Sequence, residues 1–135
     1  MARDFKELEV WRLSYNLVLD IYKIINKLPE YEKDNLTLQI RRAVVSIPIN
    51  IAEGCSRFSK KAFLQFLSYS YGSLKELYVL IMLCKDLKYI NVEEYKILYE
   101  KLDKLSRKLF VFMTSVEKEN WFDWFNKKKK IAKTI

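Results

Sequence analysis

The sequence predicts an all-α protein, an antiparallel up-down-up-down four-helix bundle. Glycine and proline number only two each in 135 residues, whereas an all-β chain needs turn residues about every ten residues. Hydrophobic residues make up 50% of the chain and charged residues 31%, which is the balance of a globular protein. Apolar residues recur at helical spacing in four segments. Because short loops join these segments, consecutive helices are expected to run antiparallel.

We expect the first helix to begin near Phe5, with Asp4 as its N-cap, and to stop at Pro29. Its apolar residues form two lines. The first is a heptad-like seam that we assign to the core, tyrosines included: Leu8, Trp11, Tyr15, Val18, Tyr22 and Ile25. The second runs beside it: Val10, Leu17, Ile21, Ile24 and Leu28. Together the two lines are wider than the core of one chain can use, which predicts a homo-oligomer.

The second helix is expected from about Asp34 to Gly54, and the third opens after a cap at Ser59. Asn91 and Glu94 resemble a capping box that starts the fourth helix. Each of these helices carries one apolar stripe: Leu36, Ile40, Ala43, Ile47 and Ile51 in the second; Phe63, Leu67, Ser70, Leu74, Leu77, Ile81 and Cys84 in the third; Tyr95, Leu98, Leu102, Leu105, Leu109, Phe112 and Val116 in the fourth.

We assign residues 1–118 to the bundle and residues 119–135 to an aromatic and lysine-rich C-terminal extension. In the extension, Trp121, Phe122, Trp124 and Phe125 precede four consecutive lysines: Lys127, Lys128, Lys129 and Lys130. It is interpreted as a frayed end whose aromatic rings pack on the bundle, as an arm that binds nucleic acid, as a membrane-surface anchor or as a contact between subunits.

The composition argues against an enzyme and against a metal or other cofactor. The chain has no histidine, which removes the usual general base and the commonest metal ligand. Cys55 and Cys84 are too few and too far apart for a zinc site, and Cys55 has no histidine to activate it. Gly54 and Gly72 are isolated, so neither starts a phosphate-binding loop.

The sequence favours a cytoplasmic location. The N-terminus, MARDFKELEV, does not resemble a signal peptide, and reduced thiols are therefore expected. No membrane span is expected either, because the longest apolar run, 77–84, is far shorter than the roughly 18 residues that a span needs. The net charge of +8 favours an anionic partner such as RNA or DNA.

The stretch QIRRAVVSIPINIAEGCSR places a proline inside the second helix. Pro48 removes one hydrogen bond and crowds the carbonyl of Val44, at a cost of about 3 kcal/mol. Ser46 and Asn50 are close enough to solvate the freed carbonyl groups, and Gly54 supplies a left-handed terminal residue or a close approach between helices. We therefore interpret this proline and this glycine as structural.

The arginines of the same stretch have two interpretations. In the structural one, they form ion pairs at a helix interface, with Arg42 paired to a carboxylate of another helix or chain and Glu53 paired to Arg57. The functional alternative is a phosphate-binding surface along the second helix and the loop after it: Arg41, Arg42, Arg57, Lys60 and Lys61.

Four blocks of the sequence follow one family pattern: FKELEVW at 5–11, LPE at 28–30, QIRRAVVSIPINIAEG at 39–54 with Arg57, and YGSLKEL at 71–77. In these blocks the chain resembles the bacterial proteins encoded within intervening sequences of 23S ribosomal RNA genes, also called S23 ribosomal proteins. The resemblance covers about residues 5–117. It implies an antiparallel four-helix bundle and a homopentamer, with motif residues that include Pro48, Asn50, Glu53, Gly54 and Gly72.

The accessory protein of diversity-generating retroelements is similar, and it binds nucleic acid and a reverse transcriptase. The leading hypothesis is therefore a non-enzymatic, oligomeric protein that binds nucleic acid, RNA above all, through a basic surface. The alternative is a structural or scaffold protein that holds a protein partner, such as a reverse transcriptase, without contacting nucleic acid.

Overall fold

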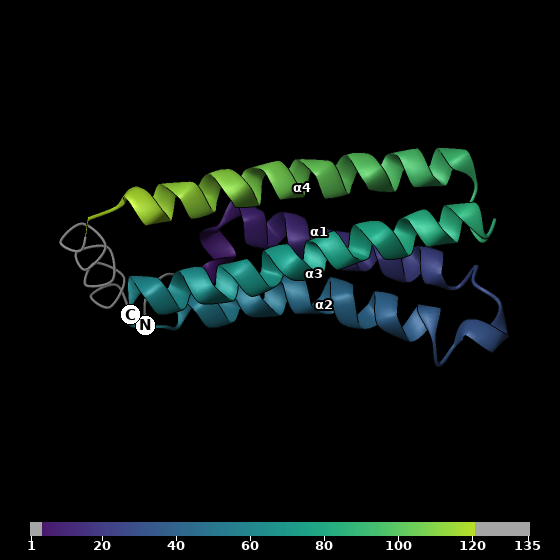
Figure 1. Cartoon of the computed structure of the whole chain (residues 1–135), viewed down its shortest axis with the longest axis horizontal. Helices are drawn as coiled ribbons and strands as arrows, with labels where there is room; N and C mark the ends of the chain where they lie inside the picture. Colours follow the sequence, from purple (N-terminus) through teal and green to yellow (C-terminus); the bar gives the residue numbers. More distant parts are fainter. Residues whose placement is uncertain (1–3, 121–135) are drawn as a thin grey trace.

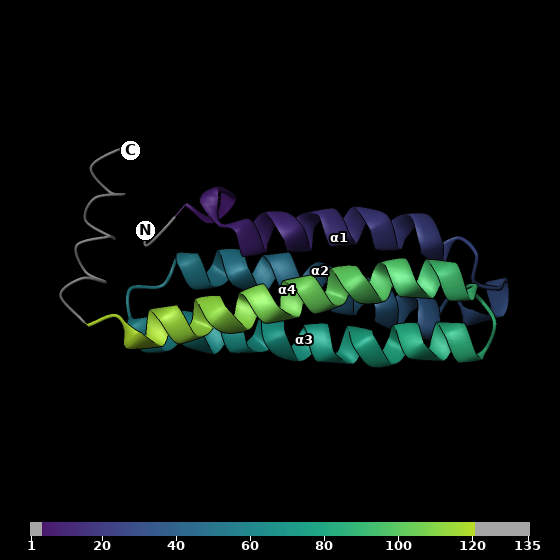
Figure 2. The same cartoon turned by 90° about the horizontal axis from the view of Figure 1, so that it is seen from above.

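The computed structural model describes residues 4–120, which form four α-helices and two short 3-10 helices without a strand (Figures 1 and 2). The elements are η1 (Phe5–Glu7), α1 (Glu9–Ile25), η2 (Glu30–Glu32), α2 (Leu36–Cys55), α3 (Lys60–Asp86) and α4 (Val92–Lys118). The helices lie side by side along one axis and alternate in direction, which confirms the predicted all-α bundle. None of these helices is both long enough and apolar enough to cross a membrane.

The first α-helix begins later in the chain than the sequence predicts. Asp4 accepts a hydrogen bond from the Lys6 amide at 3.0 Å, so its carboxylate caps η1 and not α1. Leu8 then adopts an extended conformation (φ −80°, ψ 126°), and α1 begins at Glu9. The expected start at Phe5 was wrong because the Asp4 cap closes a tight 3-10 turn that Leu8 interrupts.

α1 turns a different face to the core than the one predicted. Its buried residues are Val10, Ser14, Leu17, Ile21 and Ile25, whereas Tyr15 and Tyr22 are 48% and 42% exposed. The assignment of these two tyrosines to the core was therefore wrong. The Ser14 hydroxyl donates to the Trp11 carbonyl at 2.7 Å, and this bond lets a polar residue occupy the inner face.

α2 continues through Pro48 as far as Cys55, supported by side-chain hydrogen bonds to carbonyl groups around the proline. Ser46 donates to the Ala43 carbonyl at 2.8 Å, and Asn50 donates to the Ser46 carbonyl at 2.8 Å. Ser70 of α3 donates to the Ile47 carbonyl at 2.8 Å from a fully buried position. α2 and α3 are therefore joined by polar contacts at the proline as well as by apolar packing.

Gly54 marks a close approach between α2 and α3. A Cβ atom at this position would lie 3.0 Å from Phe63 Cδ1 and 3.1 Å from Phe66 Cβ. No glycine of the described chain has a positive φ, so the left-handed alternative for Gly54 was wrong and the close approach is confirmed. Gly72, by contrast, faces open space, because a Cβ there would have no neighbour within 4 Å.

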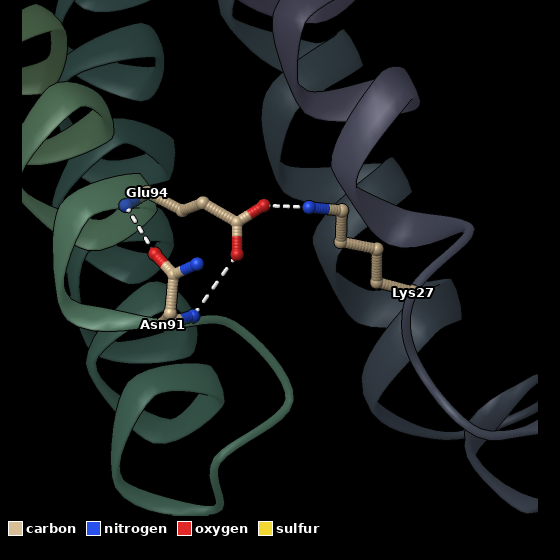
Figure 3. Close-up of polar contacts among 3 residues, drawn as sticks. All are labelled: Lys27, Asn91 and Glu94. Atoms are coloured by element: carbon tan, nitrogen blue, oxygen red, sulfur yellow. Dashed lines mark hydrogen bonds and ion pairs between the residues drawn. The ribbon is translucent and has the colours of Figure 1, made fainter.

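The capping box at the start of α4 is confirmed, and it also joins α4 to α1 (Figure 3). Asn91 accepts from the Glu94 amide at 2.8 Å, while the Glu94 carboxylate accepts from the Asn91 amide at 3.0 Å. The second oxygen of Glu94 pairs with Lys27 at the end of α1.

Two more ion pairs follow along the same seam, Lys101–Asp20 at 2.7 Å and Lys108–Glu9 at 2.7 Å. Residues of α4 that come later in the chain thus pair with residues of α1 that come earlier. This order shows directly that α1 and α4 are antiparallel.

Candidate nucleic-acid interface

The basic residues predicted to bind phosphate lie in two places on the bundle. Arg41 and Arg42 belong to the first half of α2, whereas Arg57 lies in the turn after α2, and Lys60 and Lys61 begin α3. Sixteen residues of mostly helical chain separate Arg41 from Arg57, which corresponds to about 24 Å at 1.5 Å per residue. Arg42 is exposed, and neither it nor Arg41 forms an ion pair with another described residue. The carboxylate partner expected for Arg42 is not found among residues 4–120.

The Arg57 side chain contributes to the packing of the bundle. It donates to the Glu53 carboxylate at 3.0 Å, as predicted, and its guanidinium lies 4.4 Å from the centre of the Phe66 ring. Lys60 donates to the carbonyl groups of Glu117 and Glu119 at 2.9 and 2.7 Å, where it satisfies the C-terminal end of α4. Both cations therefore have structural partners, and their contact with nucleic acid stays a prediction.

Lys61 is exposed at the first turn of α3. The four lysines at 127–130 lie outside the described residues. Among the predicted positions within residues 4–120, Arg41, Arg42 and Lys61 are thus the cations whose side chains form neither an ion pair nor a hydrogen bond with another described residue.

A different surface brings aromatic and basic side chains together. Two groups of contacting rings on α3 and α4 are bridged by Lys75, and we call these five aromatic residues the aromatic ridge: Tyr71, Tyr78, Tyr95, Tyr99 and Phe110. The ring centres of Tyr78 and Tyr99 are 5.4 Å apart, those of Tyr95 and Tyr99 are 5.7 Å apart, and those of Tyr71 and Phe110 are 6.4 Å apart. Tyr99 is 42% exposed and Phe110 is 58% exposed, so ring surface remains open to a ligand.

Two lysines lie against the rings of the aromatic ridge. The Lys75 ammonium is 4.9 Å from the ring centres of both Tyr71 and Tyr78, and it donates to the Ser106 hydroxyl at 3.2 Å. The Lys85 ammonium lies 4.4 Å from the centre of the Tyr95 ring. Lys75 has no carboxylate partner in the described chain, so its charge is available to an anion.

The Tyr78 phenol stays neutral at physiological pH. Burial raises the pKa of Tyr78 to about 12, and the neighbouring Asp103 carboxylate acts in the same direction. The aromatic ridge combines aromatic rings with adjacent lysines, which is the chemistry of a surface that can stack nucleobases and neutralise phosphates.

The sequence contained a signal for this surface that the apolar periodicity alone did not reveal. Tyr71 and Tyr78 are seven residues apart, and Lys75 lies between them. Residues at this spacing share one face of a helix, so two aromatic side chains must flank the lysine. This pattern lies beside the core stripe of the same helix. The core stripe is longer, so its apolar repeat is the stronger signal in this part of the sequence.

The cysteines show no feature of a reactive site. Cys55 and Cys84 are both buried, and burial raises the pKa of the Cys84 thiol to about 11. At neutral pH that thiol is protonated and a poor nucleophile. Within residues 4–120, no three histidine, cysteine, aspartate or glutamate side chains lie close enough to hold a metal ion.

The described chain is thus a helical bundle whose candidate site is an open aromatic and cationic surface. A family model places it further: the chain belongs to the 23S rRNA-intervening sequence protein family, matched over residues 6–111. This confirms the resemblance drawn from its motifs. No curated protein matches the chain.

A similar solved structure supports the fold. It is a protein of unknown function from the S23 ribosomal protein family of Bacteroides thetaiotaomicron VPI-5482, which superposes with a TM-score of 0.71 at 22% sequence identity. The match covers 77% of this chain and 97% of that one. Neither the family nor this neighbour is described as an enzyme.

Proposed function

We propose that the protein is a non-enzymatic, oligomeric module that binds RNA, and that the aromatic ridge is its principal contact surface. The observation that carries this proposal is the position of Lys75 between the rings of Tyr71 and Tyr78, next to the exposed ring of Tyr99. Single-stranded nucleic acid is bound by this combination, because every base has a face that stacks and every phosphate has a charge.

The cations around the ridge extend the surface for the phosphate backbone. Lys61 lines the same hollow, of about 440 Å³, as Phe110 at one end of the ridge. Lys96 follows Tyr95 at the other end and is exposed. Neither lysine forms an ion pair with another described residue. Arg41 and Arg42, on α2, would add phosphate contacts on a second face. If the protein binds RNA in this way, we expect it to act in the cytoplasm, where it would meet this ligand.

Association between copies would multiply these weak contacts. Tyr15, Leu19 and Tyr22 are 42–50% exposed along the outer side of α1, and we call them the α1 flank. Such a strip is typical of a surface that binds another protein, and a second copy would cover it. A pentamer, which the family resemblance implies, would present about +40 from five chains of +8, so that binding gains from avidity.

Tyr99→Ala is expected to weaken the binding of a fluorescein-labelled oligouridylate by roughly 5- to 150-fold, which corresponds to the loss of about 1–3 kcal/mol from one stacked base. Lys75→Ala is expected to lower the salt dependence of the binding constant, by about 0.7 in the log–log slope for each phosphate that the variant no longer neutralises. Fluorescence anisotropy at several salt concentrations measures both quantities.

Tyr69→Ala serves as the matched control for the ridge. Tyr69 is half-exposed on α3, but its ring packs on Phe66 and not on the ridge, so its removal is expected to leave RNA affinity unchanged. Equal effects of the Tyr69 and Tyr99 variants, or an affinity that does not change with salt, would refute the ridge as the binding surface. A protein partner recovered equally with and without nuclease would favour the scaffold alternative.

Light scattering is expected to give an oligomer mass for the native chain at micromolar concentration, and Leu19→Glu is expected to shift it to the monomer mass. A charged side chain in the middle of the α1 flank cannot be buried against a second copy without a large desolvation cost. Val79→Glu is the control, because Val79 is also exposed but lies on α3, on the opposite side of the bundle from α1 (Figure 2). A monomer mass for the native chain would contradict the proposal, and dissociation by Val79→Glu alone would contradict its placement on α1.

A further inference from the structure

The bundle has a groove where α4 extends past the beginning of α1. α1 has 17 residues and α4 has 27. The first residue of α1, Glu9, pairs with Lys108 at 2.7 Å, so the turns of α4 after Lys108 continue where α1 has not yet begun (Figure 2). The 3-10 turn before α1, η1, packs mainly against α1 and α2. The result is a hollow of about 630 Å³ between α1 and α4.

The floor of this α1–α4 groove is apolar. It is formed by Leu8 and Val10 from the α1 side and by Val111 and Phe112 from α4. Val111 is 66% exposed, the largest exposed fraction of the described apolar side chains in α4. α4 is apolar on all sides at this turn, since residues 109–113 read LFVFM. A helix of that kind is normally buried on all sides, whereas here Phe110 is 58% exposed beside Val111.

The rim of the groove is cationic. Lys104, Arg107 and Lys108 line it from α4, and Ser115 closes its far end. Arg107 pairs with Asp103 and Lys108 pairs with Glu9, whereas Lys104 forms no ion pair with another described residue. A hydrogen bond from Lys108, together with the charges of Lys104 and Arg12, holds the pKa of Glu9 below its usual value. The potential at this rim is therefore positive even though two of its cations are paired.

We propose that the α1–α4 groove is a docking site for an acidic amphipathic helix of a partner protein. Apolar side chains on one face of that helix would cover the floor at Val111 and Phe112, and its carboxylates would meet Lys104, Arg107 and Lys108. This function goes beyond RNA binding, and its groove adjoins the aromatic ridge on α4, because Phe110 of the ridge lines one hollow with Val111 and Ser115 of the groove.

Length and charge select this occupant over others. The groove follows α4 from Lys104 to Ser115, about 16 Å at 1.5 Å per residue, which is the length of a helix of roughly three turns. Recognition of one apolar face by a hydrophobic groove is a common mode of helix binding. An RNA backbone would place phosphates over an apolar floor. The chain's own residues 119–135 carry a net charge of +3, which the cationic rim repels.

The test uses the full chain and a fluorescein-labelled peptide of about 14 residues, with leucine at every third or fourth position and glutamate at the intervening exposed positions. Saturable binding by fluorescence anisotropy is expected, with an affinity that falls as salt is added. A second peptide with lysine in place of each glutamate is expected not to bind, because its charge has the sign of the rim.

Val111→Asp is expected to weaken binding of the acidic peptide at least about tenfold, because it puts a carboxylate on the floor of the groove. Ile97→Asp is the matched control: Ile97 is a β-branched residue of α4 that is 54% exposed outside the groove, and its variant is expected to bind the peptide as the native chain does. The RNA affinity of Val111→Asp is expected to fall less than its affinity for the peptide, because Val111 lies beside the ridge at Phe110 but is not one of its rings.

Three results would overturn the inference. Equal affinity for the acidic and basic peptides would show that charge does not select the occupant. Equal peptide binding by Val111→Asp and the native chain would place the peptide elsewhere. If Val111→Asp lost RNA binding and the acidic peptide did not bind the native chain, the groove would belong to the nucleic-acid surface. The first two results do not depend on whether the aromatic ridge binds RNA.

Discussion

Phe63→Ala is expected to lower the free energy of unfolding by about 3–5 kcal/mol, the usual range for removing a fully buried aromatic ring. Phe63 has no exposed surface, and its ring packs edge-on against Phe112 of α4 at 6.0 Å while its Cδ1 atom adjoins Gly54 of α2. The residue thus joins three helices at one end of the bundle. Because the helices around it cannot all move inward, a cavity should remain.

Urea denaturation followed by circular dichroism measures this decrease, at one protein concentration for all variants because association also contributes to stability. Phe110→Ala is the control of the same chemistry on the same bundle. Phe110 is 58% exposed, so its removal is expected to cost much less, about 1 kcal/mol. Comparable decreases for the two variants would contradict the core position assigned to Phe63.

Gly54→Ala is expected to destabilise the protein by about 1–3 kcal/mol, although alanine is normally the better residue in a helix. The new methyl group would lie 3.0 Å from Phe63 Cδ1, 3.1 Å from Phe66 Cβ and 3.3 Å from the Phe63 carbonyl oxygen. One of these neighbours is backbone, so α2 and α3 would have to separate by a few tenths of an ångström. That separation would loosen the close approach of the two helices at this point.

Gly72→Ala is the matched control, and it is expected to change stability in the opposite direction. Gly72 lies inside α3 with nothing within 4 Å of a Cβ atom, so alanine should raise the free energy of unfolding by about 0.5–1 kcal/mol through reduced chain entropy. Thermal or urea unfolding of both variants measures the change in the free energy of unfolding relative to the native chain. A destabilising Gly72→Ala would mean that another copy covers this side of α3 in solution.

Much of the fold was predictable because helix formation and capping are local. Every predicted core position of α2 and α3 is buried, since each of these helices has one unambiguous apolar stripe. The Ser59 side chain accepts from the Ala62 amide at 3.0 Å, and the capping box of Asn91 and Glu94 is formed. Such features depend on residues three or four positions apart, which the sequence places together without help from the rest of the chain.

The candidate site was predictable only in part, because its composition depends on which helices become neighbours. Lys60 was predicted to bind phosphate, but its reach to the end of α4 depends on a contact across 57 residues of sequence. Likewise, the charges of Arg41 and Arg57 share one motif in the sequence, but Arg41 lies in the first half of α2 and Arg57 lies beyond its end. The aromatic ridge required α3 and α4 to be adjacent before Tyr78 could meet Tyr99.

By itself, the sequence determined four helices, the caps of α3 and α4, the apolar stripes of the last three helices and the motif blocks that indicate the family. Only the tertiary structure decided how α1 is rotated, because its apolar surface is wide enough to face the core in more than one orientation. The buried hydroxyl of Ser14 and the exposed rings of Tyr15 and Tyr22 show the orientation that packing selected. The hydrophobic effect favours the burial of any apolar face in proportion to its area. Which apolar face of α1 is buried depends on how its side chains pack against the neighbouring helices.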